Sequence, residues 1–158
     1  MNRNKFRAWD KEANIMVYSD HRTRNLYDVY YGFEMNEKGE LECHWEGEWN
    51  ESHSLDGGSL DNLMQYTGLL DKNGVEIYEG DILLERDATI WEKYTKPDGS
   101  EWSRMSKIKK DEYYTVYFDS EKAQFVASNH WLWSTYKLTE VIGNIHENPE
   151  LLEEMVDG

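Results

Sequence analysis

Short runs of alternating apolar and polar residues, separated by turns that contain glycine, recur along this chain. The clearest example is QYTGLLDKNGVEIYEGDILLE, residues 65–85. A period of two places one face of a strand against a core and the other face in solvent. In the DKNG segment, Asp71 can bond its own backbone, and Gly74 or Asn73 can adopt positive φ. These residues predict a β-hairpin followed by a bend or bulge at Gly80 and Asp81, and none of them needs a ligand.

The same pattern predicts further hairpins. They are expected at residues 4–20, 24–49 and 112–128, with another strand region at 130–148 around Leu138, Val141 and Ile145. In the second hairpin Cys43 lies on the apolar face, between Leu41 and Trp45. The chain then ends in NPELLEEMV, which predicts a short helix with Asn148 as N-cap and Pro149 at the first helical position.

Many short strands, tight turns and one terminal helix predict a mainly β fold built around a small barrel. A length of 158 residues suits one domain, 1–158, and an aromatic content of 14% supplies side chains for its core. Residues 86–111 lose the alternation and form a polar, basic insertion. They fit either an ordered β-arm with KPDG at its tip or a mobile loop.

Charge is distributed unevenly along the chain, whose net charge is -15. Residues 34–61 contain nine acidic residues and one lysine, and residues 140–158 contain six acidic residues and no Lys or Arg. Residues 93–110 carry a net charge of +4, from six cations against two acids. This segment is either a solvated loop or a contact arm. Its cations are Lys93, Lys96, Arg104, Lys107, Lys109 and Lys110.

No residue pattern predicts catalysis, a cofactor or a metal site. Cys43 and His44 are adjacent on a strand and therefore point to opposite faces, so they do not readily share one ion. The serine and cysteine residues lack the context of a known nucleophile, and the glycines do not form a phosphate loop. We therefore expect a protein that is not an enzyme.

The segment HWLWSTY contains two tryptophans, Trp131 and Trp133, that fall on the same face if it is a strand. The favoured interpretation places both in the core, where they anchor the barrel. In the alternative they form an exposed platform that stacks bases or holds a peptide, since Trp and Tyr are frequent at contact hot spots.

Four segments of the sequence resemble the YopX family of phage and prophage proteins: NKFRAWD, MVYSD, LMQYTGLLDKNGVEIYEGDIL and EVIGNIHENPELL. The resemblance implies an SH3-like antiparallel barrel from about Leu63 to the C-terminus, residues 63–158, preceded by a β-rich N-terminal elaboration, residues 1–62. It also implies a phage or prophage origin in a bacterium. It implies no activity and no catalytic residues.

Three functions remain open at this point. The first is a non-enzymatic phage or prophage accessory protein that binds an unknown host or phage protein. The second is a nucleic-acid-binding module that uses residues 93–110, although the net charge opposes it. The third is an acidic DNA mimic. The chain has no run of about 18 apolar residues, no secretory signal and a single cysteine, so we expect a cytoplasmic protein without a membrane span.

Overall fold

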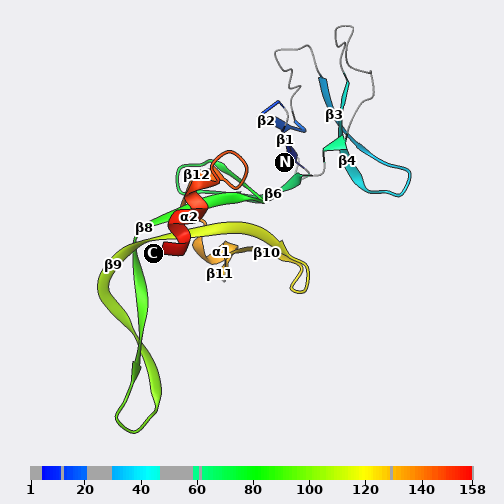
Figure 1. Ribbon diagram of the computed structural model, residues 1–158. Helices are drawn as coiled ribbons and strands as arrows, with labels where there is room; N and C mark the ends of the chain where they lie inside the picture. The colour runs from blue at the N-terminus through cyan, green and yellow to red at the C-terminus, as the bar shows by residue number, and fades with distance from the viewer. Residues whose placement is uncertain are drawn as a thin grey trace. The chain divides into compact units, whose positions relative to one another are not determined.

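The chain is mainly β, as the sequence predicts, and it divides into two compact units (Figure 1). The computed structural model describes residues 5–11, 13–20, 30–46, 59–60, 62–128 and 130–157. Unit 1 comprises Met1–Leu69 and Glu76–Gly80, and unit 2 comprises Leu70–Val75 and Asp81–Gly158. In this division most of the 63–80 hairpin groups with the N-terminal strands, and the expected boundary at residue 63 stays a prediction.

Unit 1 contains two antiparallel sheets. The first has the strand order β2-β1-β6-β7, and the second has the order β3-β4-β5. Strand β1 is central in the first sheet, since Ala8 pairs with Val17 of β2 and with Leu63 of β6. The strand bounds are β1 Phe6–Asp10, β2 Ile15–Tyr18, β3 Tyr30–Met35, β4 Leu41–Glu46, β5 Ser59–Leu60, β6 Leu63–Leu70 and β7 Glu76–Tyr78. The predicted hairpins β1–β2 and β3–β4 are both confirmed.

The core of unit 1 joins these two sheets. Ala8, Val17, Tyr31 and Cys43 are buried together, as expected for the apolar face of β4. One polar contact lies in this core, because the Tyr31 hydroxyl donates a hydrogen bond of 2.6 Å to Oδ2 of the buried Asp10. The carboxylate therefore keeps a partner inside an otherwise apolar cluster, as buried charge requires.

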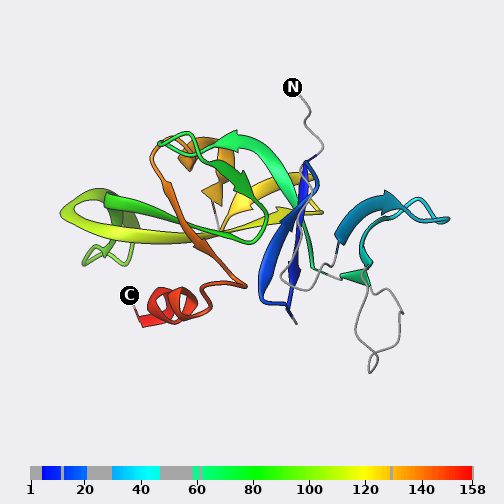
Figure 2. The same cartoon turned by 90° about the horizontal axis from the view of Figure 1, so that it is seen from above.

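Unit 2 is a five-stranded antiparallel sheet with the order β11-β10-β9-β8-β12. The sheet curls into a half barrel (Figure 2), which agrees with the small barrel predicted from the sequence, while its SH3-like character stays a prediction. Ile82, Leu83, Val116 and Leu132 are buried in the unit. Its elements are β8 Asp81–Thr95, β9 Glu101–Asp119, β10 Gln124–Ala127, β11 His130–Trp131, α1 Leu132–Thr135, β12 Glu140–Asn144 and α2 Glu150–Asp157.

The turn between β6 and β7 is fastened to β12 by Asp71. Oδ1 of this buried carboxylate accepts from the N–H groups of Asn73 at 2.8 Å and Val75 at 2.9 Å, and Oδ2 accepts from Val141 N–H at 2.9 Å. Gly74 has a φ of 85°, which confirms the predicted positive-φ position. The DKNG motif thus closes a turn and also holds that turn against the rest of unit 2.

A compact loop leads into α2. The side chain of Asn144 accepts from the N–H groups of His146 and Glu147 at 3.0 and 2.9 Å. Oδ1 of Asn148 accepts from Asn144 N–H at 3.3 Å, so this side chain fastens the loop to β12. A Cβ at Gly143 would lie 2.4 Å from that oxygen, so only glycine leaves room for the contact. The predicted terminal helix is present, but it begins at Glu150, one residue after the predicted first position, Pro149.

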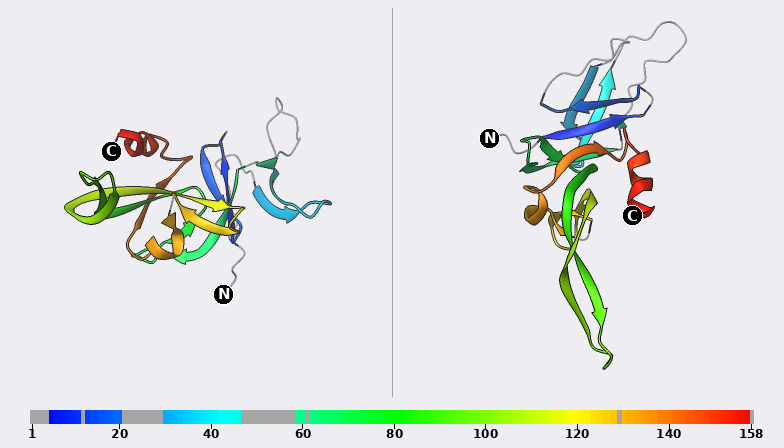
Figure 3. Two further views of the ribbon diagram at one scale, coloured as in Figure 1. Left: turned by 90° about the horizontal axis from the view of Figure 1, so that it is seen from below. Right: turned by 90° about the vertical axis from the view of Figure 1, so that its left-hand side faces the viewer.

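Two predictions for residues 86–148 are resolved by the structure. The basic segment is an ordered β-arm, made by the distal parts of β8 and β9 (Figure 3). The strand region expected at 130–148 is wrong in its extent, because α1 interrupts it and only Glu140–Asn144 forms the later strand. Leu138 lies in the turn after α1, and Ile145 lies in the turn after β12.

Candidate interaction surfaces

Among the residues that the structure describes, the potential metal ligands do not cluster, and the cysteine is buried. No group of three or more His, Cys, Asp or Glu side chains in this part of the chain is placed to hold a metal ion. Cys43 is fully buried, and this burial raises the pKa of its thiol to about 11, with the Asp10 carboxylate adding to the shift. A thiol with that pKa is protonated at neutral pH and is a poor nucleophile.

The β8–β9 arm is a two-stranded ribbon. Strand β12 pairs with β8 only as far as Leu84, and β10 pairs with β9 only from Val116 onward. Beyond these points, Glu85–Thr95 and Glu101–Glu112 pair with one another and with no other described strand. Two register shifts interrupt the ribbon, between Glu85 and Ala88 and between Thr89 and Trp91. Bulges of this kind bend a ribbon and increase its twist.

The six cations predicted from the sequence all lie on this arm. The side chains of Lys93, Lys96 and Lys110 are exposed. Arg104, Lys107 and Lys109 belong to strand β9, and their side chains lie outside the described part of the structure. The backbone therefore gathers the predicted basic residues on one hairpin.

An aromatic pair lies at the tip of the arm, where the sequence analysis identified only lysines. Tyr94 and Trp102 are register partners whose ring centroids are 6.1 Å apart, and the Lys96 ammonium lies 5.0 Å from the centroid of the Trp102 ring. Trp102 is 54% exposed. We name Lys93, Tyr94, Lys96 and Trp102 the tip cluster. Its sequence signal is an aromatic residue on either side of a KPDG turn.

The turn that carries the tip cluster is closed by Asp98. Its carboxylate accepts from the N–H and the hydroxyl of Ser100, at 2.9 and 2.6 Å, and these hydrogen bonds lower the pKa of Asp98. Lys96 and Ser100 add a backbone hydrogen bond of 2.9 Å across the turn. The carboxylate of Asp98 therefore already accepts hydrogen bonds from within its own turn.

Trp131 and Trp133 form a second exposed surface, so the prediction that they anchor the core is wrong. Their side chains are 53% and 61% exposed, and their ring centroids lie 5.7 Å apart at an interplanar angle of 31°. The chain passes from β11 into α1 at this point, and Leu132 between them is the buried residue. Leu138, in the turn after α1, is 57% exposed. We call Trp131 and Trp133 the tryptophan surface.

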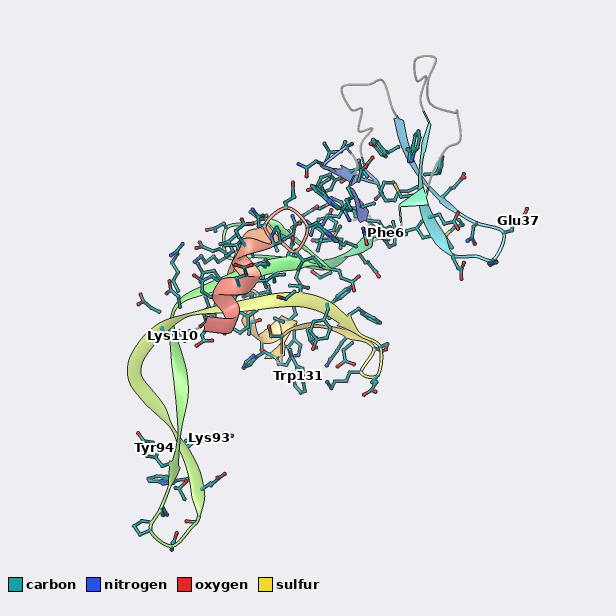
Figure 4. All side chains as sticks on the ribbon, in the orientation of Figure 1. Phe6, Glu37, Lys93, Tyr94, Lys110 and Trp131 are labelled. Carbon is teal, nitrogen blue, oxygen red and sulfur yellow. The ribbon has the colours of Figure 1, made fainter. Side chains whose placement is uncertain are left out.

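The structure does not bring the predicted contact residues into one site. Figure 4 shows Lys93 and Tyr94 at the far end of the arm, well away from Trp131 on the body of unit 2. Lys110 lies near the base of the arm in the same view. The arm and the tryptophan surface are therefore two separate candidate surfaces.

Ion pairs fix the base of the arm to β12. Glu140 accepts from Lys72 at 3.1 Å and from Arg86 at 2.8 Å, and these contacts, that with Lys72 above all, lower the pKa of the Glu140 carboxyl. Asp111 accepts from the Asp87 N–H at 3.0 Å, where Asp87 itself has a φ of 53°. These contacts stabilise the base of the arm and do not involve the residues of the tip cluster.

The model of one protein family, described as YopX protein, matches residues 5–153 of this chain. The chain belongs to the YopX family. Among solved structures, it is similar to protein EF1440 from Enterococcus faecalis, with 28% sequence identity, coverage of 94% of this chain and 97% of that chain, and a TM-score of 0.48. No curated protein matches it.

The YopX match includes both candidate surfaces, since the arm and the segment from Trp131 to Leu138 lie within residues 5–153. It assigns a family and no reaction or ligand. No described helix of this YopX protein is both long enough and apolar enough to cross a membrane. Its function is therefore argued from the two surfaces themselves.

Proposed function

We propose that this YopX protein is a non-enzymatic accessory protein, encoded by a phage or prophage, that acts in the bacterial cytoplasm by binding a protein partner. The tryptophan surface is the contact site. The exposure of two adjacent tryptophan rings on the body of unit 2 carries this proposal.

The two exposed tryptophan rings leave a large apolar area in water, and covering that area with a partner is favourable. Each large aromatic side chain buries roughly 150–250 Å² when it is covered, and Trp is among the residues most enriched at binding hot spots. Burial of Leu132 fixes the backbone between the two rings, so the pair is held in place before any partner arrives. Preorganised side chains lose less conformational entropy on binding.

The chemistry of the surface indicates what the partner presents. Two neighbouring indole rings favour an apolar or aromatic side chain seated against them. The partner is therefore a protein segment with an apolar or aromatic anchor.

A pull-down tests the proposal. Tagged full-length protein is incubated with a lysate of a bacterium that carries the gene, with and without nuclease. The partner is then purified and its affinity measured by calorimetry. Trp131→Ala with Trp133→Ala is expected to weaken that affinity by at least about 30-fold, since hot-spot truncation costs about 2 kcal/mol or more.

Trp102→Ala is the matched control, because Trp102 is as exposed as Trp131 but lies on the arm. It is expected to leave the protein partner bound, as is nuclease treatment. A partner that binds the double variant and the wild type equally well would contradict the proposal. Capture that disappears with nuclease would contradict it as well.

A further inference from the structure

The tip of the β8–β9 arm is remote from most of the charge of its own unit. From Glu85 to Thr95 the strand extends roughly 30 Å at about 3.3 Å per residue. That length is several times the Debye length of about 8–10 Å at ordinary ionic strength. A ligand at the tip therefore experiences mainly the local charges of the arm, and much less of the charge on the body of unit 2.

The local charge of the arm is positive. Between Ala88 and Lys110 the chain has six cationic residues and three acidic ones, Glu92, Asp98 and Glu101. Asp98 is engaged by Ser100 within the turn. Among the described side chains, no carboxylate lies within ion-pair distance of Lys93 or Lys96, and both lysines are exposed.

The tip cluster combines these cations with an aromatic face. Tyr94 and Trp102 lie opposite one another and so project from one side of the ribbon, while Lys93, one residue earlier, projects from the other. The Lys96 ammonium covers the Trp102 ring at 5.0 Å. A planar base can replace the ammonium over this ring, and the flexible Lys96 side chain can then reach the phosphate beside that base.

We infer that the tip cluster binds single-stranded nucleic acid. A base stacks on Trp102, a phosphate beside it pairs with Lys96, and a further phosphate pairs with Lys93 where the strand passes around the ribbon to its other side. Stacking needs an unpaired base, and one ring of this size accepts any of the four bases. Binding is therefore weak, salt-sensitive and tolerant of sequence. This contact is independent of the protein partner proposed above, since it uses another part of unit 2.

Fluorescence anisotropy with labelled oligothymidine measures this binding. At about 50 mM salt the full-length protein is expected to bind with a Kd of roughly 1–100 µM, as nonspecific phosphate contacts give. Trp102→Ala is expected to weaken binding at least about fivefold. Lys93→Gln with Lys96→Gln is expected to lower the slope of log K against log salt by about 1.4, because each single-strand phosphate contact contributes about 0.7.

Two variants match these changes elsewhere on unit 2. Trp133→Ala removes an equally exposed indole, and Lys122→Gln with Lys137→Gln removes the same charge from exposed positions. Both are expected to leave the affinity within about twofold of wild type. Thermal melting checks that all variants fold.

Four results would overturn the inference. They are no anisotropy change up to about 100 µM protein, equal weakening by tip and control variants, equal affinity for duplex DNA of the same length, and equal affinity for labelled oligoglutamate. The last would show that the tip recognises negative charge alone and fits an acidic protein segment.

Discussion

At the scale of single residues, burial decides the chemistry of Cys43. The cysteine lies in a cluster with Ala8, Val17 and Tyr31, and its thiol has no contact with solvent. Because the medium is apolar and Asp10 is nearby, the thiolate is disfavoured and the pKa rises from 9.0 to about 11. Alternation along β4 predicted this burial correctly, and burial is enough to make the thiol inert.

The raised pKa of Cys43 predicts a stability change at alkaline pH. Below the unfolded pKa of 9.0 the thiol is protonated in both states, so its contribution is fully present. As the pH rises towards the folded pKa of about 11, only the unfolded state ionises, and stability is lost. Across this pH interval the free energy of unfolding should therefore fall by about 2–3 kcal/mol less in Cys43→Ala than in the wild type. Urea unfolding at each pH measures this difference.

The tyrosines whose pKa values burial raises, Tyr66, Tyr78 and Tyr114, remain in both proteins. Their contribution cancels in the comparison, and the difference reports Cys43 alone. Parallel stability curves for the two proteins between pH 9 and 11 would show that the thiol ionises freely in the fold.

The hydrogen bond between Tyr31 and Asp10 predicts a second stability change. Tyr31→Phe removes the donor, and a hydrogen bond to a charged group contributes about 1.5–3 kcal/mol. We expect the free energy of unfolding to fall by that amount. In an Asp10→Asn background the same change should cost clearly less, since the acceptor is neutral. Equal costs in both backgrounds would show that the 2.6 Å contact contributes nothing specific.

At the scale of elements, turns made the hairpins predictable. DKNG and NEKG each contain the glycine that adopts positive φ, Gly74 and Gly39, and the strands beside them keep their alternation because one face meets a core. The arm could not be predicted in the same way. Most of the described side chains in its distal part, such as Lys93 and Trp102, are exposed and need no alternation, so only the KPDG turn indicates a hairpin.

The favoured interpretation of Trp131 and Trp133 as core residues is wrong for a different reason. Alternation assumes that a strand continues, but the chain turns into α1 after Trp131. A helix of four residues is too short to leave a periodic signal. The buried position then falls on Leu132, and both flanking rings face solvent. The sequence offered the exposed platform as an alternative, and this local change of conformation decides in its favour.

Substitution of Gly74 tests the turn that fastens β6 and β7. A Cβ at this position would meet no atom within 4 Å, so any cost comes from the φ of 85° and not from a clash. Gly74→Ala or Gly74→Val should lower stability by about 1–2 kcal/mol, measured by thermal melting. Gly74→Asn is the control and should cost less, because asparagine tolerates positive φ. Equal melting temperatures for the wild type and Gly74→Val would contradict this prediction.

At the scale of the whole molecule, the chain crosses between its two units more than once. It leaves unit 1 after Leu69, returns at Glu76 and leaves again after Gly80. The hairpin that the sequence assigned to a barrel of residues 63–158 therefore pairs with β1, through Phe6–Ala8 and Leu63–Gln65. A local sequence pattern reveals a hairpin but not its neighbour in the sheet, which is set by distant residues.

Hydrogen exchange in two deletion variants tests whether β6 and β7 depend on β1 or belong to a self-sufficient barrel of residues 63–158. In a fragment that begins at Leu63, β6 and β7 lose β1 and remain as a two-stranded hairpin whose turn is still bonded to β12 through Asp71. A two-stranded hairpin without a further strand beside it is marginally stable in water. Their amides should then exchange rapidly, while those of Ile82–Leu84 and Val116 stay protected by the sheet of unit 2.

The control joins Ala88 to Lys110, which are register partners, through an Asn-Gly turn and so removes only the arm. It should leave protection in both units unchanged, because the arm pairs with itself alone. Full protection of β6 in the fragment would instead support residues 63–158 as a self-sufficient barrel.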